Sequence, residues 1–247
     1  MDPILHKYND NIAKHYAAYR PALHKLILRR LIRPNEHFRI ALDVGCGTGY
    51  STIALSEYSD HVLGLDSNQA MLDRATMHPK ISYFKGDGDD FSILEQNHFD
   101  VVSFAGSLSH TKSDRLKSEL LRTLVQDGVV LIYDFQVLLD DLMARMNINV
   151  DASASNYNFE ENFGEWPEFT PEIVGTDTVQ LDLSTQEAAH ILLANSQRYQ
   201  EFQNRFHESD PFETLVGFIQ KQKIPPGLEA AIFFSRYRMS HVHTTNG

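Results

Sequence analysis

Residues 39–50, Arg-Ile-Ala-Leu-Asp-Val-Gly-Cys-Gly-Thr-Gly-Tyr, decide the fold. The apolar run from Ile40 to Val44 is typical of a strand that is buried on both faces of a parallel sheet. Three glycines at alternate positions follow it, and glycine adopts positive φ angles and lets a ligand lie against the backbone. A helix is predicted from Ser51 to Tyr58. This order of strand, glycine turn and helix indicates a nucleotide-binding site.

The spacing of the glycines disfavours a dinucleotide. A Gly-x-Gly-x-x-Gly/Ala fingerprint counted from Gly45 requires a small residue where the chain has Tyr50. Asp43 stands two positions before the first glycine, and Gly47 and Gly49 complete the alternate spacing. This pattern resembles the signature loop of class I S-adenosylmethionine-dependent methyltransferases. The ammonium and sulfonium groups of that cofactor favour a nearby carboxylate. An ordinary glycine-rich turn is the alternative interpretation of the loop alone.

A second apolar run, residues 61–65, ends in Asp66, roughly twenty residues past the glycine loop. A carboxylate at the end of a strand accepts hydrogen bonds from ribose hydroxyls, so we expect Asp66 to bind the ribose. The resemblance implies that the residues just after it, including Ser67 and Met71, line the adenine pocket. A core position for Met71 is the alternative.

The next two predicted strands, residues 81–84 and 98–105, supply further cofactor contacts in the resemblance. Asp87 would accept a hydrogen bond from the adenine amine, and the backbone amide of Gly88 would face the ring nitrogens. Ala105 and Gly106 would let the methionine part of the cofactor approach. Three acids crowd the turn at residues 87–90, but solvated acids are commoner than metal ligands, so we expect no metal.

Ser107 and His110 would face the transferred methyl group in the resemblance. An unperturbed imidazole pKa near ~6.5 suits a proton acceptor, so His110 is a catalytic candidate. The segment before the sheet often closes over cofactor and substrate in this family, which makes Tyr16 a second catalytic candidate and Tyr19 and Arg20 candidate substrate contacts. The alternative places both tyrosines in the core and Arg20 in solvent.

Two further residues are candidate substrate contacts. Tyr133 ends the predicted fifth strand, residues 129–134, on the ligand side, where Asp134 follows it. Trp166 lies in an acidic, aromatic-rich stretch, residues 151–172, which is predicted to form a lid or an interface at the substrate mouth. The acids of this stretch suggest a basic acceptor, although a charge run is more often a solvated face.

The alternation of strands and helices predicts an α/β fold with a doubly wound, mostly parallel, seven-stranded Rossmann-like sheet. We predict one methyltransferase domain over residues 1–247. Its parts are an N-terminal helical segment (1–36), a cofactor-binding core (37–135), an insertion or lid with the sixth strand (136–206), and a C-terminal helix with the last strand (207–247). The C-terminal pattern resembles small-molecule methyltransferases of the trans-aconitate type.

The amino-acid composition limits the classes of partner that the protein is expected to bind. The net charge of −11 argues against nucleic acid, which binds clustered Lys and Arg. No apolar run is long enough to span a membrane, and the first residues do not resemble a secretion signal, so a cytoplasmic location is expected. The single cysteine, Cys46, cannot form an intramolecular disulfide. We expect a monomer or a homodimer.

These motifs predict transfer of a methyl group from S-adenosylmethionine, by in-line displacement, to an oxygen or nitrogen nucleophile of a small molecule. The product would be S-adenosylhomocysteine. One alternative is a non-catalytic protein that binds the cofactor and docks a partner protein through its acidic aromatic segment. An NAD-linked oxidoreductase is a further alternative, which Tyr50 disfavours.

Overall fold

The computed structural model describes residues 12, 14, 15, 18, 22–148, 157–221 and 228–240. The chain divides into two compact units. The sheet unit comprises residues 22–135, 157–177 and 232–247, and the helical unit comprises residues 1–21, 136–156 and 178–231. The predicted insertion therefore contributes to both units. The prediction of a single domain stays a prediction.

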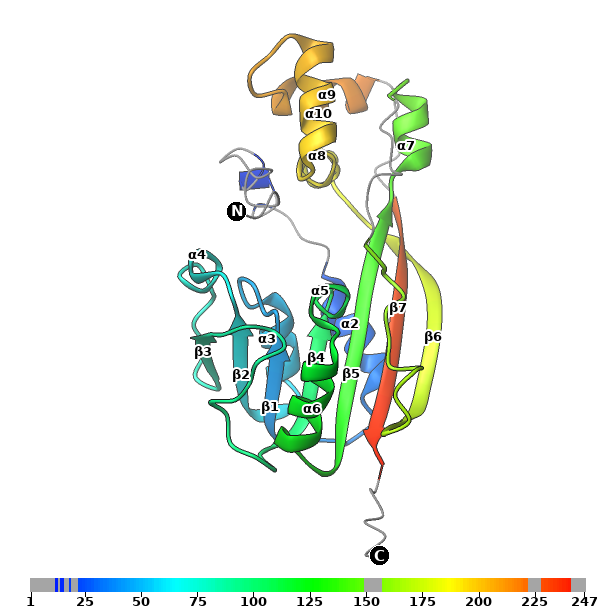
Figure 1. Ribbon diagram of the computed structural model, residues 1–247. Helices are drawn as coiled ribbons and strands as arrows, with labels where there is room; N and C mark the ends of the chain where they lie inside the picture. The colour runs from blue at the N-terminus through cyan, green and yellow to red at the C-terminus, as the bar shows by residue number, and fades with distance from the viewer. Residues whose placement is uncertain are drawn as a thin grey trace, which may run out of the picture. The chain divides into compact units, whose positions relative to one another are not determined.

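A seven-stranded sheet with the order β3-β2-β1-β4-β5-β7-β6 forms the sheet unit, and the ends of its last three strands belong to the helical unit (Figure 1). The strands are β1 (Phe38–Val44), β2 (Ser59–Asp66), β3 (Ile81–Lys85), β4 (Phe99–Ala105), β5 (Leu124–Leu138), β6 (Phe169–Leu181) and β7 (Leu228–Met239). The first five pair in parallel, and Figure 1 shows β7 running opposite to β5. The predicted fold class is confirmed.

The register of β1 brings the ends of its neighbours together. Val44 pairs with Leu65 of β2 on one side and with Phe104 of β4 on the other. The strand order reverses between β1 and β4, and ligands of open α/β sheets bind at such a point. Asp66 and Ala105 therefore end their strands beside the glycine loop.

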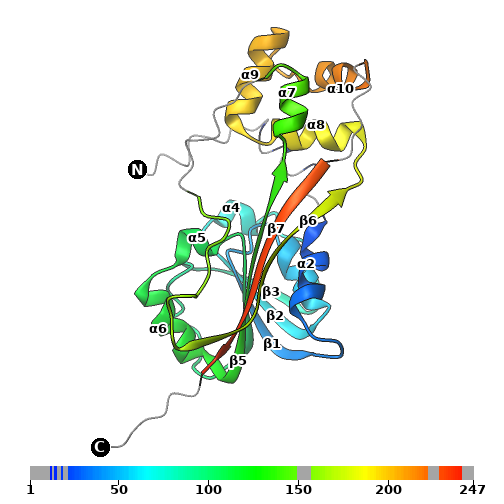
Figure 2. The same cartoon turned by 90° about the vertical axis from the view of Figure 1, so that its right-hand side faces the viewer.

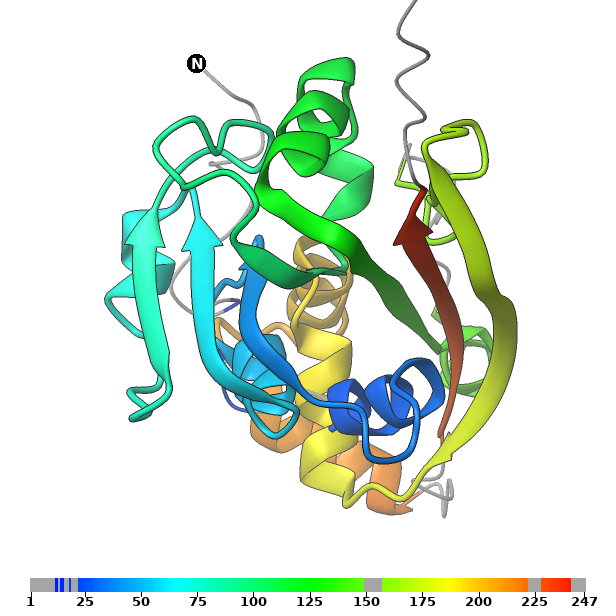
Figure 3. The same ribbon diagram turned by 90° about the horizontal axis from the view of Figure 1, so that it is seen from below.

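Helices cover both faces of the sheet (Figure 3). They are α2 (Leu23–Leu31), α3 (Tyr50–Ser56), α4 (Gln69–Leu72), α5 (Leu108–Thr111) and α6 (Asp114–Thr123). Ser113 begins α6 by accepting a hydrogen bond from the Leu116 amide at 3.1 Å, which satisfies one of the free amides of a helix start. Strand β5 begins earlier than the predicted residue 129, and it contains an irregularity at Asp127, which has a φ of 61°.

Residues 157–169 pass beside α5 and α6 (Figure 2). The Lys112 ammonium binds Glu161 at 2.6 Å, and the Asn158 amide donates to Ser109 Oγ at 3.2 Å. The rings of Phe163 and Trp166 pack 4.3 Å apart in the core of the sheet unit. This part of the predicted lid is therefore a packed part of the sheet unit.

The helical unit contains α7 (Asp140–Arg145), α8 (Thr185–Leu193), α9 (Ser196–Phe206) and α10 (Phe212–Lys221). Strand β5 continues to Leu138, past the predicted end at residue 134, and helix α7 begins at Asp140. A capping box begins α8, since the Ser184 hydroxyl and the Glu187 carboxylate bind each other's backbone amides.

A buried ionic cluster ties β6 and β7 to the end of α2. Arg236 on β7 is 0% exposed and donates to Glu36 at 2.6 and 2.8 Å, to Glu172 at 2.5 Å and to the Leu31 carbonyl at 3.0 Å. Glu172 on β6 also accepts from Arg238 at 2.6 Å. Burial opposes ionisation of Glu172, but the hydrogen bonds from the two arginines outweigh it and lower its pKa to about 2.

We predict that Glu172→Gln destabilises the sheet unit in a pH-dependent way. The folded-state pKa lies below the ordinary 4.5, so the stabilisation is complete above pH 4.5 and is lost as the pH falls toward 2. Urea unfolding should show the variant less stable by about 3 kcal/mol at pH 7, and by only about 1 kcal/mol at pH 3. Glu165→Gln, at a site that is 85% exposed, is the control and should change neither value. A pH-independent difference would contradict this account.

Candidate functional site

The glycine loop after β1 has two packed glycines and one open one. Gly45, Gly47 and Gly49 have φ angles of 73°, 55° and 88°, which L side chains rarely adopt. A Cβ at Gly45 would lie 2.5 Å from Ser107 Cβ, and one at Gly49 would lie 2.1 Å from the Tyr83 hydroxyl. A Cβ at Gly47 would meet nothing within 4 Å. Gly47 therefore leaves a cradle in which a ligand can lie against the backbone.

Asp66 holds this loop at the end of β2. Its Oδ2 accepts from the Gly47 amide at 2.8 Å, and its Oδ1 accepts from the Asn68 amide at 2.8 Å. Each carboxylate oxygen keeps a lone pair for another donor, so the half-buried side chain can still accept from ribose hydroxyls. Asn68 caps α4, with Ser67 exposed before it and Met71 half-buried within it.

Asp43 is a buried carboxylate directly before the loop. It is 0% exposed, and its Oδ2 accepts from the Ser51 and Thr52 hydroxyls at 2.7 Å each. Among the described residues its Oδ1 has no hydrogen-bond partner. Burial raises the pKa of this carboxyl to about 6, although the two hydroxyls oppose the shift. A carboxylate with an unused buried oxygen beside an open cradle fits a cationic group of a ligand.

The loop after β4 packs against the glycine loop. The Ser107 hydroxyl donates to the Val44 carbonyl at 2.5 Å, so this predicted substrate contact connects the ends of β4 and β1. Gly106 has a φ of 74°, and a Cβ there would lie 3.1 Å from Asp134 Oδ1. Ala105 before it is half-buried.

The predicted adenine turn follows β3. Asp87 is exposed, and its carbonyl accepts from the Asp90 amide at 3.1 Å. A Cβ at Gly88 would lie 2.3 Å from Thr111 Cγ2, so a larger residue at this position would displace the Thr111 side chain. The contacts of both residues with a cofactor stay predictions.

A pocket of about 190 Å³ lies within the sheet unit, beside the end of β4 and residues 132–134 of β5. Its lining includes Gly106, Asp134 and residues 157–162. The Tyr157 hydroxyl lies 2.7 Å from the Gly106 carbonyl and 2.5 Å from Asp134 Oδ2, so it connects the pocket wall to the loop after β4. Sequence reasoning missed this contact because the partners are 51 and 23 residues away; the aromatic-rich composition of the segment was the only signal.

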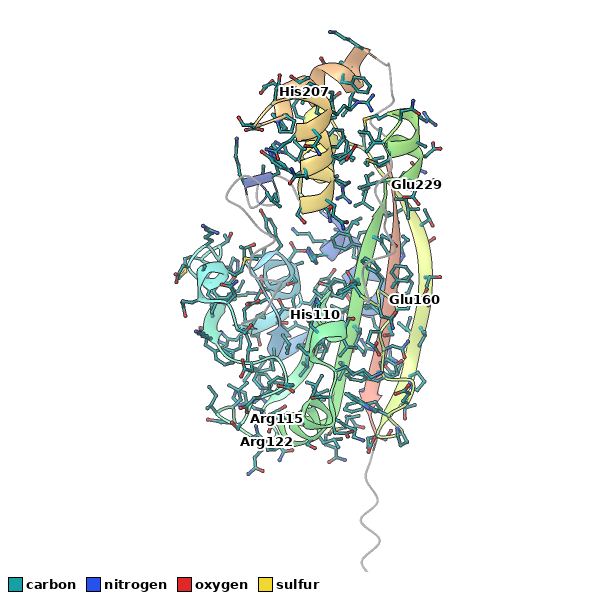
Figure 4. The ribbon with its side chains drawn as sticks, turned by 45° about the horizontal axis from the view of Figure 1, so that its top comes forward. His110, Arg115, Arg122, Glu160, His207 and Glu229 are labelled. Atoms are coloured by element: carbon teal, nitrogen blue, oxygen red, sulfur yellow. The ribbon has the colours of Figure 1, made fainter. Side chains whose placement is uncertain are left out.

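The remaining predicted residues lie at different distances from this pocket. His110 is exposed on α5, and its ring centroid lies 5.1 Å from that of Tyr157 (Figure 4). Tyr133 is among the lining residues, but it is only 2% exposed and its hydroxyl lies 3.2 Å from Nδ1 of His24 on α2. Trp166 does not line the pocket and is buried in the core. Their functional roles stay predictions.

The predicted catalytic Tyr16 and the predicted substrate contacts Tyr19 and Arg20 lie outside the described residues. Within the part of the chain that the structure describes, no group of three His, Cys, Asp or Glu side chains could hold a metal ion. None of the described helices is long and apolar enough to cross a membrane.

The strand order, the open glycine loop and the acid at the end of β2 together define a class I S-adenosylmethionine-dependent methyltransferase fold. Residues 41–128 match a family model described as a methyltransferase domain. Over these residues, which are less than half of the chain, the protein is therefore similar to class I S-adenosylmethionine-dependent methyltransferases, whose cofactor is S-adenosylmethionine.

Known relatives agree with this assignment. A probable S-adenosylmethionine-dependent methyltransferase of Saccharomyces cerevisiae is 28% identical over 122 residues, which cover 46% of this chain and 42% of the relative. A demethylmenaquinone methyltransferase of Lactobacillus johnsonii is 37% identical over 101 residues, which cover 36% and 41%. The matches thus span less than half of these relatives. The solved structure of a putative type II methyltransferase from Anaeromyxobacter dehalogenans has the same fold, with a TM-score of 0.63 at 17% identity over 90% of this chain and 98% of that one.

We predict that Asp43→Asn stabilises the protein without ligand and weakens cofactor binding. The folded-state pKa of about 6 lies above the ordinary 3.8, so the wild-type protein loses stability as the pH rises from 4 to 7, by about 2 kcal/mol. Asparagine keeps an acceptor for Ser51 and Thr52 but has no charge to bury. Urea unfolding at pH 4 and pH 7 should show this fall only in the wild type. Calorimetry should show an affinity of the variant for S-adenosylhomocysteine at least tenfold lower. The same pH dependence in both proteins would contradict the prediction.

Alanine substitutions at two glycines of the loop should distinguish the glycine that leaves room for a ligand from a glycine that packs within the protein. Gly47→Ala strains the backbone by about 1–2 kcal/mol but meets no atom, so the protein should fold and bind S-adenosylhomocysteine at least tenfold more weakly. Gly45→Ala must also displace Ser107 and should lower the melting temperature further. Calorimetry and thermal unfolding measure both effects. Normal affinity in Gly47→Ala would exclude the cradle as the binding site.

Proposed function

We propose that this chain transfers the methyl group of S-adenosylmethionine to an oxygen or nitrogen nucleophile of a small molecule. One observation carries the proposal: the loop after β4 borders both the glycine loop and the pocket. Gly106 lines the pocket, and the next residue, Ser107, binds the Val44 carbonyl and packs on Gly45. An acceptor in the pocket would therefore lie next to the cofactor site.

The bound cofactor would supply a methyl group on a positively charged sulfur. Asp66 would hold the ribose, the Gly47 cradle and Asp43 would hold the charged amino-acid end, and the pocket would place the nucleophile in line with the methyl group. Such positioning contributes roughly 7–11 kcal/mol to lowering a barrier, so the reaction does not depend on a strong base. Tyr157 and the aromatic residues near it would exclude water, which strengthens electrostatic interactions in the site.

The relatives support a small-molecule acceptor. The Lactobacillus johnsonii protein is named for demethylmenaquinone, which is a small molecule. The trans-aconitate-like subgroup is a finer part of the proposal and has the C-terminal sequence pattern as its support.

His110 is the proposed proton acceptor. It is exposed and its ring lies against Tyr157, which lines the pocket, so it would take a proton from the acceptor and release it to solvent. General bases contribute typically 10²–10⁴-fold to a rate. The contact of His110 with the pocket-lining Tyr157 supports this choice, whereas the Tyr133 hydroxyl lies 3.2 Å from Nδ1 of His24.

We predict methyl transfer from labelled S-adenosylmethionine to a component of a small-metabolite pool. His110→Ala should lower kcat about 100-fold and leave the affinity for S-adenosylhomocysteine unchanged, because His110 does not hold the cofactor. Asp66→Ala should weaken that affinity at least tenfold. His61→Ala, at an exposed site on β2, is the control and should match the wild type.

The outcomes separate the alternatives. Methyl transfer to any acceptor would exclude a non-catalytic scaffold. An undiminished rate in His110→Ala would remove His110 as the base. If S-adenosylhomocysteine did not bind, or bound Asp66→Ala as tightly as the wild type, the proposed function would be abandoned.

A further inference from the structure

Two histidines of the helical unit join the N-terminal segment, residues 12–18, to helix α8. The described residues of this segment, Ile12, Lys14, His15 and Ala18, are helical. Nδ1 of His15 lies 2.9 Å from Nδ1 of His190 on α8, which is a hydrogen bond between the two rings. One ring nitrogen donates this bond and the other accepts it, and a ring that accepts at Nδ1 is neutral. The histidine pair therefore forms only when at least one of its two rings is neutral.

Aromatic rings surround the histidine pair. Phe212 at the start of α10 stacks on both histidines, with its centroid 5.4 Å from that of His15 and 4.3 Å from that of His190. The ring of Tyr199 on α9 lies 5.9 Å from His15, and its hydroxyl donates to the Ser209 carbonyl at 3.0 Å. His15 is 0% exposed, and among the described residues its Nε2 has no hydrogen-bond partner. A buried polar atom without a partner costs stability, so packing alone does not explain a histidine at this position.

Three charged side chains face the histidine pair. Asp210, just before α10, lies 3.8 Å from Nε2 of His15 and 3.5 Å from the Lys14 ammonium. Burial and repulsion by His190 lower the pKa of His15, although Asp210 opposes the shift. Burial and repulsion by Lys14 lower the pKa of His190, although Glu187 on α8 opposes it. The surroundings of both rings therefore favour their neutral forms.

We propose that the histidine pair is an acid-sensitive switch, which holds the N-terminal segment on the helical unit at neutral pH and releases it when both rings are protonated. Two protonated rings have no acceptor at Nδ1, so the bond between them is lost and two like charges face each other. After release both rings are in water, where nothing opposes their protonation. The switch lies within the helical unit and does not depend on methyl transfer.

The direction of the pH dependence follows from linkage. In the attached segment the pKa values of His15 and His190 lie below the ordinary 6.5, so the released segment binds more protons in acid. Attachment is therefore complete above pH 6.5 and is lost as the pH falls through the two lowered pKa values. Each proton taken up on release weakens the attachment by up to about tenfold per pH unit.

A nitroxide label on the segment measures its attachment. Ala18→Cys supplies a thiol at an exposed position, whereas the native Cys46 is 4% exposed and has a raised pKa because it is buried, so it reacts slowly. Electron paramagnetic resonance gives the ratio of mobile to immobile label. This ratio should rise at least tenfold from pH 7.5 to pH 5, while far-UV circular dichroism and the emission of Trp166 in the sheet unit stay unchanged. A smaller rise, or one that accompanies unfolding, would overturn the proposal.

Two variants of the labelled chain test the pair itself. His190→Asn keeps a polar group that can bind Nδ1 of His15 but cannot be charged, and His15→Phe keeps the ring stack on Phe212. One titrating ring remains in each, without repulsion from the other, so the ratio should rise only about threefold or less over the same pH range. A tenfold rise in either variant would overturn the proposal. If one variant is not attached at pH 7.5, the other decides.

His207→Asn is the matched control. His207 is an exposed histidine of the same helical unit, at the end of α9 (Figure 4). Its φ of 57° is one that asparagine also adopts, so the substitution should not strain the backbone. The labelled control should show the full tenfold rise of the wild type. A control that lost the rise would assign the pH dependence to histidines in general and would overturn the pair as its source.

Discussion

The parallel register of β1 with β2 and β4 is the constraint on which the site depends. Because Val44 pairs with both Leu65 and Phe104, three strands end at the same level and their following loops meet. Hydrogen bonds then link the loops, from the Gly47 amide to Asp66 and from Ser107 to the Val44 carbonyl. A shift of β1 by one residue would separate these partners, and it would turn the side chains of that strand to the opposite face of the sheet.

Two buried ionisable side chains, Arg236 and Asp43, differ in how fully their partners compensate the charge. Arg236 is buried with carboxylate partners, so its charge is compensated and it stabilises the edge of the sheet. Asp43 is buried with only two hydroxyls, and one of its oxygens has no partner among the described residues. A charge that is so poorly compensated lowers the stability of the protein without ligand. Stability is sacrificed in this way at sites where a ligand later supplies the missing partner.

The sequence predicted those features that depend on short segments. The strand, glycine turn and helix around Gly45 and the acid at the end of β2 are local patterns with a physical signature, and the structure has each of them. Contacts between distant segments have no such signature. The contact of Tyr157 with Gly106 and Asp134 and the cluster around Arg236 join residues far apart in the chain, so neither was visible in the pattern of one sequence.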